Sequence, residues 1–224
     1  MLIPEPELQR LFAVPLAHYD MPDPERLCAS LSELFLECDG KDEFRNSIRR
    51  DTQKGALFES RFDLFNWEQA PVRELAGYCN ACLSQVIRST SDYGEEELGQ
   101  LRMDYHAWFH VTRSGGFQGA HNHPNASWSG IFCVDPGAPA KDAREGTVRF
   151  YDPRGNADYY SDPGNQNLVQ PYRHGGSQVR HETGKLVIFP SYLVHEVFPY
   201  FGEDPRVIVA FNCWIDSEQG KAFY

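Results

Sequence analysis

Two segments in the first hundred residues repeat apolar side chains every three or four positions, as one face of a helix does. They span residues 23–38 and 69–89, and Asp23 is placed to cap the first of them. We expect a short strand over 11–20 before these helices and a polar loop over 38–60 between them. The repeated positions are Leu27, Leu31, Leu34 and Leu36 in the first segment and Leu75, Cys79, Leu83 and Ile87 in the second.

The pattern changes after residue 100, where short aliphatic and aromatic runs are separated by glycine and proline clusters. This spacing is typical of a β-sandwich or barrel. We expect a single domain over 1–224, in which 1–100 supply the opening strand and helices that support the outside of the sheet, and 101–216 form the β core. The Gly-, Pro- and Asn-rich stretch 152–181 is predicted to be a loop over the barrel mouth. The predicted strands are 100–111, 128–134, 146–152, 177–182, 185–190 and 206–215.

The composition and charge of the chain argue against some classes of partner and location. The chain has 224 residues, of which 41% are hydrophobic, and its formal net charge is -11. Nucleic acids and anionic membranes bind clustered Lys and Arg, so this charge argues against both partners. No apolar stretch approaches the roughly 18 residues of a membrane-spanning helix, and the N-terminal residues lack the basic and apolar regions of a secretory signal. We therefore expect a cytoplasmic protein, with a homodimer as the base expectation for its assembly.

Six cysteines raise the question of disulfides or a zinc site. In a cytoplasmic chain thiols stay reduced. Cys79 and Cys82 form a C-x-x-C pair within the second predicted helix, with no second pair to complete a zinc site. We expect all six to be free, buried or half-buried thiols.

The densest chemical feature is the sequence His121-Asn122-His123-Pro124. Two residues apart on an extended chain, His121 and His123 project from the same side and can reach one metal ion. Imidazole suits Fe, Zn, Cu and Ni, and three facial protein ligands leave positions open for other molecules. The alternative is a pair of polar histidines at a strand end.

A third histidine, His195, follows much later in the chain. It comes after an apolar segment predicted to be a strand, and a hairpin through residues 201–205 then leads into a last strand. In that last strand Arg206, Ile208, Ala210 and Asn212 share one face. An arginine inside a sheet is costly without an anionic partner, and its planar fork matches a carboxylate. The alternative partner for Arg206 is Glu203 or Asp204 in the hairpin.

Taken together, these blocks resemble the 2-oxoglutarate/Fe(II) oxygenase family found in marine bacteria and phages. The resemblance covers roughly residues 104–215 and rests on an HxHPxxxxSG block, a DPR block and an FPSxxxH…R…FN ending. It implies a double-stranded β-helix (a jelly-roll or cupin-like fold, mainly β) with Fe(II), 2-oxoglutarate and O₂ as cofactor and co-substrates.

The resemblance also implies roles for individual residues. His121 and His195 match the first and last metal ligands, and His123 stands where the wider superfamily has an acid. Arg206 matches the residue that binds the far carboxylate of 2-oxoglutarate. Ser129 and Asn212 are further candidates for contact with the co-substrate. Should a carboxylate ligate instead of His123, the candidates are Asp152 and Glu196.

The implied reaction is hydroxylation of a small molecule or a protein side chain. Two other classes stay open. One is a cupin-type dioxygenase that holds its metal by three histidines without 2-oxoglutarate, and the other is a non-catalytic metal-binding jelly roll. By strand parity, Trp108 and His110 are predicted to line the barrel interior, whereas His174 and His181 are expected to be exposed in the long loop.

Overall fold

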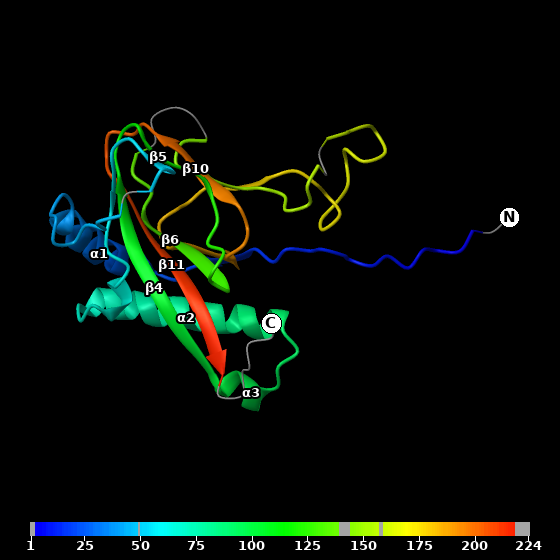
Figure 1. Ribbon diagram of the computed structural model, residues 1–224, viewed down its shortest axis with the longest axis horizontal. Coiled ribbons are helices and arrows are strands. Elements are labelled where there is room, and N and C mark those ends of the chain that lie inside the picture. Colours follow the sequence, from blue (N-terminus) through cyan, green and yellow to red (C-terminus); the bar gives the residue numbers. More distant parts are fainter. Residues whose placement is uncertain (1–2, 49, 139–143, 157–158, 218–224) are drawn as a thin grey trace.

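In the computed structural model, which describes residues 3–48, 50–138, 144–156 and 159–217, the strands form two antiparallel sheets that face each other (Figure 1). The fold is a double-stranded β-helix, as the sequence predicts. Across the larger sheet, the order is β1 (Ala17–Asp20), β9 (Lys185–Pro190), β6 (Trp128–Asp135), β11 (Arg206–Ser217), β4 (Leu101–Thr112) and β3 (Leu57–Glu59). Across the smaller sheet it is β2 (Gln53–Lys54), β5 (Gly116–His121), β10 (His195–Tyr200), β7 (Val148–Phe150) and β8 (Ser177–Val179).

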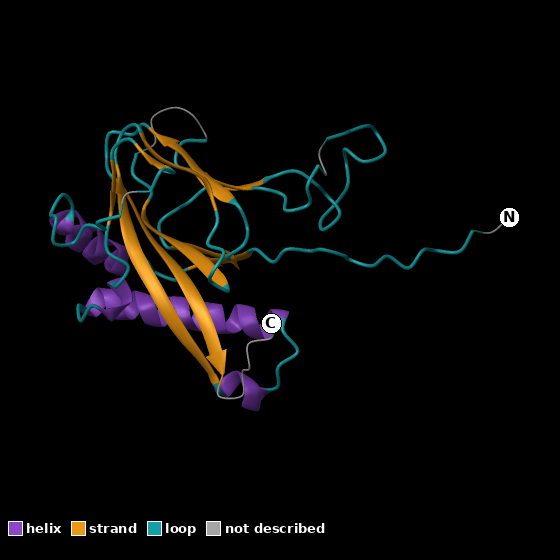
Figure 2. Ribbon diagram, viewed as in Figure 1, coloured by secondary structure: helices purple, strands orange, loops and turns teal. Residues whose placement is uncertain are grey.

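Helices cover the outer face of the larger sheet (Figure 2). Helix α1 (Glu25–Cys38) and helix α2 (Ala70–Thr90) confirm the two predicted helices, with short turns at η1 (Leu64–Asn66) and α3 (Glu95–Gly99). The predicted cap is wrong: Pro24 occupies the N-cap position, no side chain bonds there, and Asp23 has a positive φ of 47°. None of the described helices is both long and apolar enough to cross a lipid bilayer.

Alternation along β4 and β11 separates two cores. The odd-numbered residues Phe109, Val209 and Phe211 are fully buried against the helices. Even-numbered residues of the same strands, such as Trp108 and Ile208, point between the two sheets. The parity predicted for the last strand is therefore confirmed, and it directs one face of each strand into the cavity that holds the candidate site.

Several strands depart from the predicted pattern. The segment expected to be a polar loop over 38–60 contains β2, which adds to the smaller sheet, and β3, which adds to the larger one. β1 confirms the opening strand expected over 11–20. The sequence predicts a hairpin between His195 and Arg206. This prediction is wrong, because β10 lies in the smaller sheet and β11 in the larger, so the two strands do not pair. This connection instead carries the chain from one sheet to the other.

The described residues of the long connection after β7, 151–156 and 159–176, do not line the cavity between the sheets. They and the described N-terminal segment project from the same side of the body (Figure 1), and parts of both line a second cavity. Tyr159 and Tyr160 on this connection are 89% and 67% exposed. In the described part of the chain, therefore, the predicted loop does not cover the barrel mouth.

Candidate metal centre

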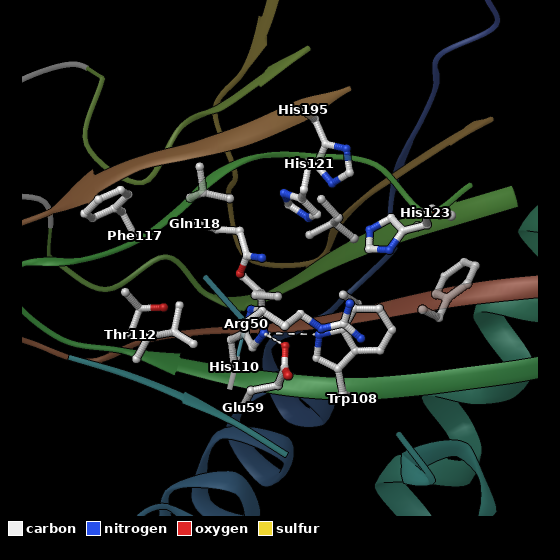
Figure 3. A pocket seen from close by; sticks show the side chains of 18 of the residues that line it. Arg50, Glu59, Trp108, His110, Thr112, Phe117, Gln118, His121, His123 and His195 are labelled. Atoms are coloured by element: carbon white, nitrogen blue, oxygen red, sulfur yellow. Dashed lines mark hydrogen bonds and ion pairs between the residues drawn. The ribbon is translucent and has the colours of Figure 1, made fainter. Parts of the chain in front are cut away.

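Three histidines meet between the sheets. His121 ends β5, His195 begins β10, and the two residues are direct partners across the antiparallel pair. His123 lies just beyond the strand, where its backbone N–H donates to the carbonyl of Ser191 at 2.9 Å. One potential ligand atom from each imidazole lies within 4.8 Å of the others. Figure 3 shows the three rings turned toward one another above the cavity.

An irregularity in β5 shapes this end of the sheet. The register passes from His195↔His121 to Val197↔Gln118, so three steps on β5 oppose two on β10. Such a bulge alters the alternation of side chains, and bulges are frequent beside functional sites. Gln118 and His121 consequently line the same cavity (Figure 3).

Backbone carbonyls set the tautomer of two of the histidines. Nδ1 of His121 lies 2.8 Å from the Gly119 oxygen, and Nδ1 of His195 lies 3.0 Å from the Leu193 oxygen. A carbonyl can only accept, so each Nδ1 carries the proton and donates it. The lone pair of each Nε2 is therefore free to bind a metal ion, an arrangement common among metal-binding histidines.

His123 is held differently, by a chain of side chains. Its Nδ1 lies 3.3 Å from Asn212 Nδ2, while the hydroxyl of Ser129 donates to Asn212 Oδ1 at 2.7 Å. Ser129 Oγ lies a further 2.8 Å from Ser191 Oγ. Ser129 and Asn212, predicted to contact a co-substrate, thus bond each other, and Asn212 also contacts the third histidine.

Burial keeps the three rings neutral. Desolvation lowers the pKa of His121, and it lowers the pKa of His195 well below the usual value. For His123, burial first and then the neighbouring His121 lower the pKa to about 3. Neutral imidazoles present lone pairs to a cation without competition from protons at neutral pH.

Arg206 lines the same cavity and is 3% exposed. No described carboxylate lies within ion-pair distance of its guanidinium, so the alternative pairing with Glu203 or Asp204 is wrong. Its Nη2 donates to Nδ1 of His181 at 3.1 Å. His181 is 4% exposed, which corrects the prediction that it is a solvated loop residue. A cation buried with only a neutral partner is a costly arrangement unless an anion binds beside it.

The opposite wall carries charged residues that the sequence did not single out. Glu59, 6% exposed, accepts hydrogen bonds from Gln53 at 2.5 Å and Asn46 at 2.7 Å, and lies 2.8 Å from Nε2 of His110. Burial alone would raise the pKa of Glu59, but the bonds from His110 and Asn46 lower it overall. Arg50 stands beside this group at the cavity (Figure 3).

The other residues that the sequence singled out either line the cavity or are bonded elsewhere in the protein. Trp108 and His110 line the cavity, as their parity predicts. Asp152 is bonded by Arg154, which lowers its pKa to about 2, and Glu196 pairs with Arg149. Neither carboxylate belongs to the histidine cluster found in the described chain. All six cysteines are free and buried.

Comparison with known proteins agrees with this geometry. Residues 106–212 match the model of a family described as "Putative 2OG-Fe(II) oxygenase", and this segment contains the three histidines and Arg206. None of the curated proteins matches the chain.

Among solved structures, a prolyl-4-hydroxylase from Pseudomonas putida is similar with a TM-score of 0.62 and 14% identity, over 92% of this chain and 93% of that one. A prolyl hydroxylase from Trichoplax adhaerens, in complex with a peptide fragment, gives 0.57 and 12% over 89% and 83%. HygX from Streptomyces hygroscopicus, with nickel, 2-oxoglutarate and hygromycin B bound, gives 0.54 and 13% over 95% and 85%. At these identities the likeness establishes the shared fold.

Proposed function

We propose that this chain, a member of the 2-oxoglutarate/Fe(II)-dependent oxygenases, holds Fe(II) through His121, His123 and His195 and binds 2-oxoglutarate through Arg206. The observation that carries the proposal is the pairing of a neutral, convergent histidine cluster with a buried, uncompensated arginine in one cavity. A metal site at the histidines and a buried cation in the same cavity match a co-substrate with two carboxylates, one bound at the metal and the other at Arg206.

The residues present fit the metal. Imidazole nitrogens are accepted ligands of Fe(II), and a facial set of three leaves positions open for a chelating co-substrate and O₂. Backbone carbonyls fix His121 and His195 with Nε2 available. With His123 in place of an acid, the protein contributes no negative charge to the ion, so the site gains more from an anionic co-substrate than a site with a carboxylate would.

The residues present in the cavity also fit 2-oxoglutarate. Burial lowers the pKa of Arg206 by removing water from its guanidinium, and a carboxylate bound in the planar fork would offset that cost. The amide of Gln118, 6% exposed and lining the same cavity, has an oxygen with no hydrogen-bond partner among the described residues. A bound molecule can satisfy the amide, since the two ends of a glutamine side chain exchange by rotation. HygX carries nickel and 2-oxoglutarate on a similar fold.

Bound Fe(II) and 2-oxoglutarate would together supply O₂ activation, with succinate and CO₂ as co-products and hydroxylation of an unactivated C–H bond as the outcome. The chain's own contribution is to bind, orient and exclude water. Trp108, Ile131 and Phe189 give the cavity an apolar lining, while the histidines and Arg206 fix the two ends of the co-substrate. Two of the similar structures hold a peptide fragment and hygromycin B, which supports either a protein or a small molecule as the substrate of this chain.

Arg206 also separates this function from a three-histidine dioxygenase that does without 2-oxoglutarate. Such an enzyme has a use for the histidines but none for a buried guanidinium that contacts only a neutral ring. The arginine therefore favours the co-substrate.

Anaerobic addition of Fe(II) and then 2-oxoglutarate tests the proposal by visible absorbance. We expect a weak metal-to-ligand charge-transfer band only when both are present, because it requires chelation at an open metal site. His121→Ala should abolish the band. Arg206→Ala should raise the 2-oxoglutarate concentration for half-maximal band by about 10-fold or more, as loss of a charged hydrogen-bond pair does. Iron that binds without the band, or an Arg206→Ala protein with unchanged 2-oxoglutarate affinity, would overturn it.

A further inference from the structure

A line of aromatic rings leads from the histidine cluster to the surface. The Trp108 ring lies 5.9 Å from the His123 ring and 4.8 Å from Phe62. Phe62 is followed by His106 at 6.2 Å, and His106 by Trp214 at 4.7 Å. We call Trp108, Phe62, His106 and Trp214 the ring track. Trp108 lines the cavity, and the tilted rings of the other three residues continue from it toward the surface.

Strands β4 and β11 continue past the end of β6 (Figure 1), and Trp214 lies on this extension. On the inward face of β4, Trp108 is 5% exposed, but His106, one repeat further, is exposed. Main-chain groups of β4 and β11 bond to each other here, as in the pairs Asn212↔His106 and Trp214↔Asp104. The side chains of the ring track therefore lie on the cavity-facing side of the paired β4 and β11 strands.

A cation stands beside the ring track. The Arg50 guanidinium lies 5.3 Å from the centre of the Phe62 ring, and Arg50 lines the cavity of the three histidines. No described carboxylate lies within ion-pair distance of it. The acid nearby, Glu59, is already bonded by Asn46 and Gln53 and contacts His110. The Arg50 guanidinium is consequently positioned on a ring and available to an anion.

We propose that the primary substrate is a small organic anion with a planar ring, whose acid group binds Arg50 and whose ring lies along Trp108 and Phe62. This inference rests on the proposed function, in which Arg206 is occupied by 2-oxoglutarate and leaves Arg50 as the second cation of the cavity. A molecule held in this way spans from the mouth of the cavity to the histidine cluster. Its reactive C–H bond would lie on the side facing His123.

The test uses two soluble probes that differ only in charge, indole-3-acetate and indole-3-acetamide. Their binding is measured by equilibrium dialysis, on the metal-free protein and on the anaerobic protein with Fe(II) and 2-oxoglutarate. We expect the carboxylate to bind about 10-fold more tightly than the amide, the difference that one charge-assisted contact provides. Arg50→Met should remove that preference, and Arg50→Lys should restore part of it.

Arg45 offers a matched control. Its guanidinium also lies over a phenylalanine ring, Phe58, at 4.6 Å, but outside the histidine cavity. Arg45→Met should leave the preference intact. Equal binding of the two probes, a preference that survives Arg50→Met, or failure of both probes to bind would overturn the proposal. Because dialysis does not depend on the charge-transfer band, loss of the band with an intact Arg50-dependent preference would instead contradict the metal and co-substrate assignment.

Discussion

Asn212 joins His123 to the hydroxyls of Ser129 and Ser191, and the direction of this hydrogen-bonded chain decides which nitrogen of His123 is free. With Asn212 Oδ1 turned toward the ring, His123 Nδ1 donates its proton and Nε2 is free for a metal. With the amide nitrogen turned toward it, Nδ1 accepts and the proton resides on Nε2. Both hydroxyls can reverse to match either arrangement. Metal binding should select the first one.

Asn212→Ala should therefore weaken metal binding. Partners of this kind typically contribute 10- to 100-fold to metal affinity, and we expect a loss near 10-fold because His121 and His195 keep their own carbonyl acceptors. Isothermal titration with Mn(II) under anaerobic conditions measures it. Asn122→Ala is the matched control, since the exposed Asn122 amide donates to the Tyr192 carbonyl and not to a histidine. A variant with wild-type Mn(II) affinity would show that Asn212 has no part in orienting His123.

At the scale of strands and helices, pattern alone predicts the elements whose burial is regular. β4, β6, β9 and β11 are rich in aliphatic and aromatic residues, and both long helices carry an apolar stripe. β5, with the sequence GFQGAH, has neither alternation nor β-branched residues, and its bulge depends on pairing with β10. Such a strand is defined by its partner and not by its own propensity.

Some residues of the candidate site could likewise be predicted from the sequence, and others could not. The three histidines and Arg206 stand in recognisable motifs, so their convergence in one cavity could be predicted. Glu59 and Arg50 could not, because they come from a polar segment whose short strands are ordered only by contact with β4 and β5. His181 was misjudged because its burial comes from packing beside Arg206, a contact 25 residues away in sequence.

Helix α2 stabilises the sheet from the side opposite the cavity, so a change in it should separate stability from metal binding. Leu83 is fully buried in the core between the helices and the larger sheet. Leu83→Ala should reduce the free energy of unfolding by about 2–5 kcal/mol, the usual cost of such a cavity. Mn(II) affinity of the folded protein should stay within about 2-fold.

Urea unfolding and Mn(II) titration on the same variant check this expectation. Leu36→Ala is the control, since Leu36 on α1 is 38% exposed and its loss should change stability by less than about 0.5 kcal/mol. A fall in metal affinity with Leu83→Ala, in protein that is fully folded by circular dichroism, would mean that the two cores are not independent.

For the molecule as a whole, the buried histidines couple the site to folding. Burial lowers the pKa of His181 and His195 well below the usual value, reinforced by Arg206 in the first case and His121 in the second. A base with a depressed pKa in the folded state is protonated first in the unfolded chain, whose histidines titrate near pH ~6.5. Stability is then complete above that pH and is lost as the pH falls below it.

Each histidine with a strongly lowered pKa should contribute a slope of about 1.4 kcal/mol per pH unit below pH ~6, so that His123, His181 and His195 together give about 4 kcal/mol per unit, to which His121 adds. Metal-free protein should accordingly show a constant urea midpoint from pH 8 to 7 and a steep fall between pH 6 and 5. The carboxylates do not account for this window, because Glu59 has a lowered pKa and titrates at more acidic pH. His181→Gln should reduce the slope by about 1.4 kcal/mol per pH unit and leave the urea midpoint between pH 7 and 8 independent of pH. A midpoint that stays flat from pH 6.5 to 5 would mean that these rings accept protons in the folded state and that the histidine cluster is open to water.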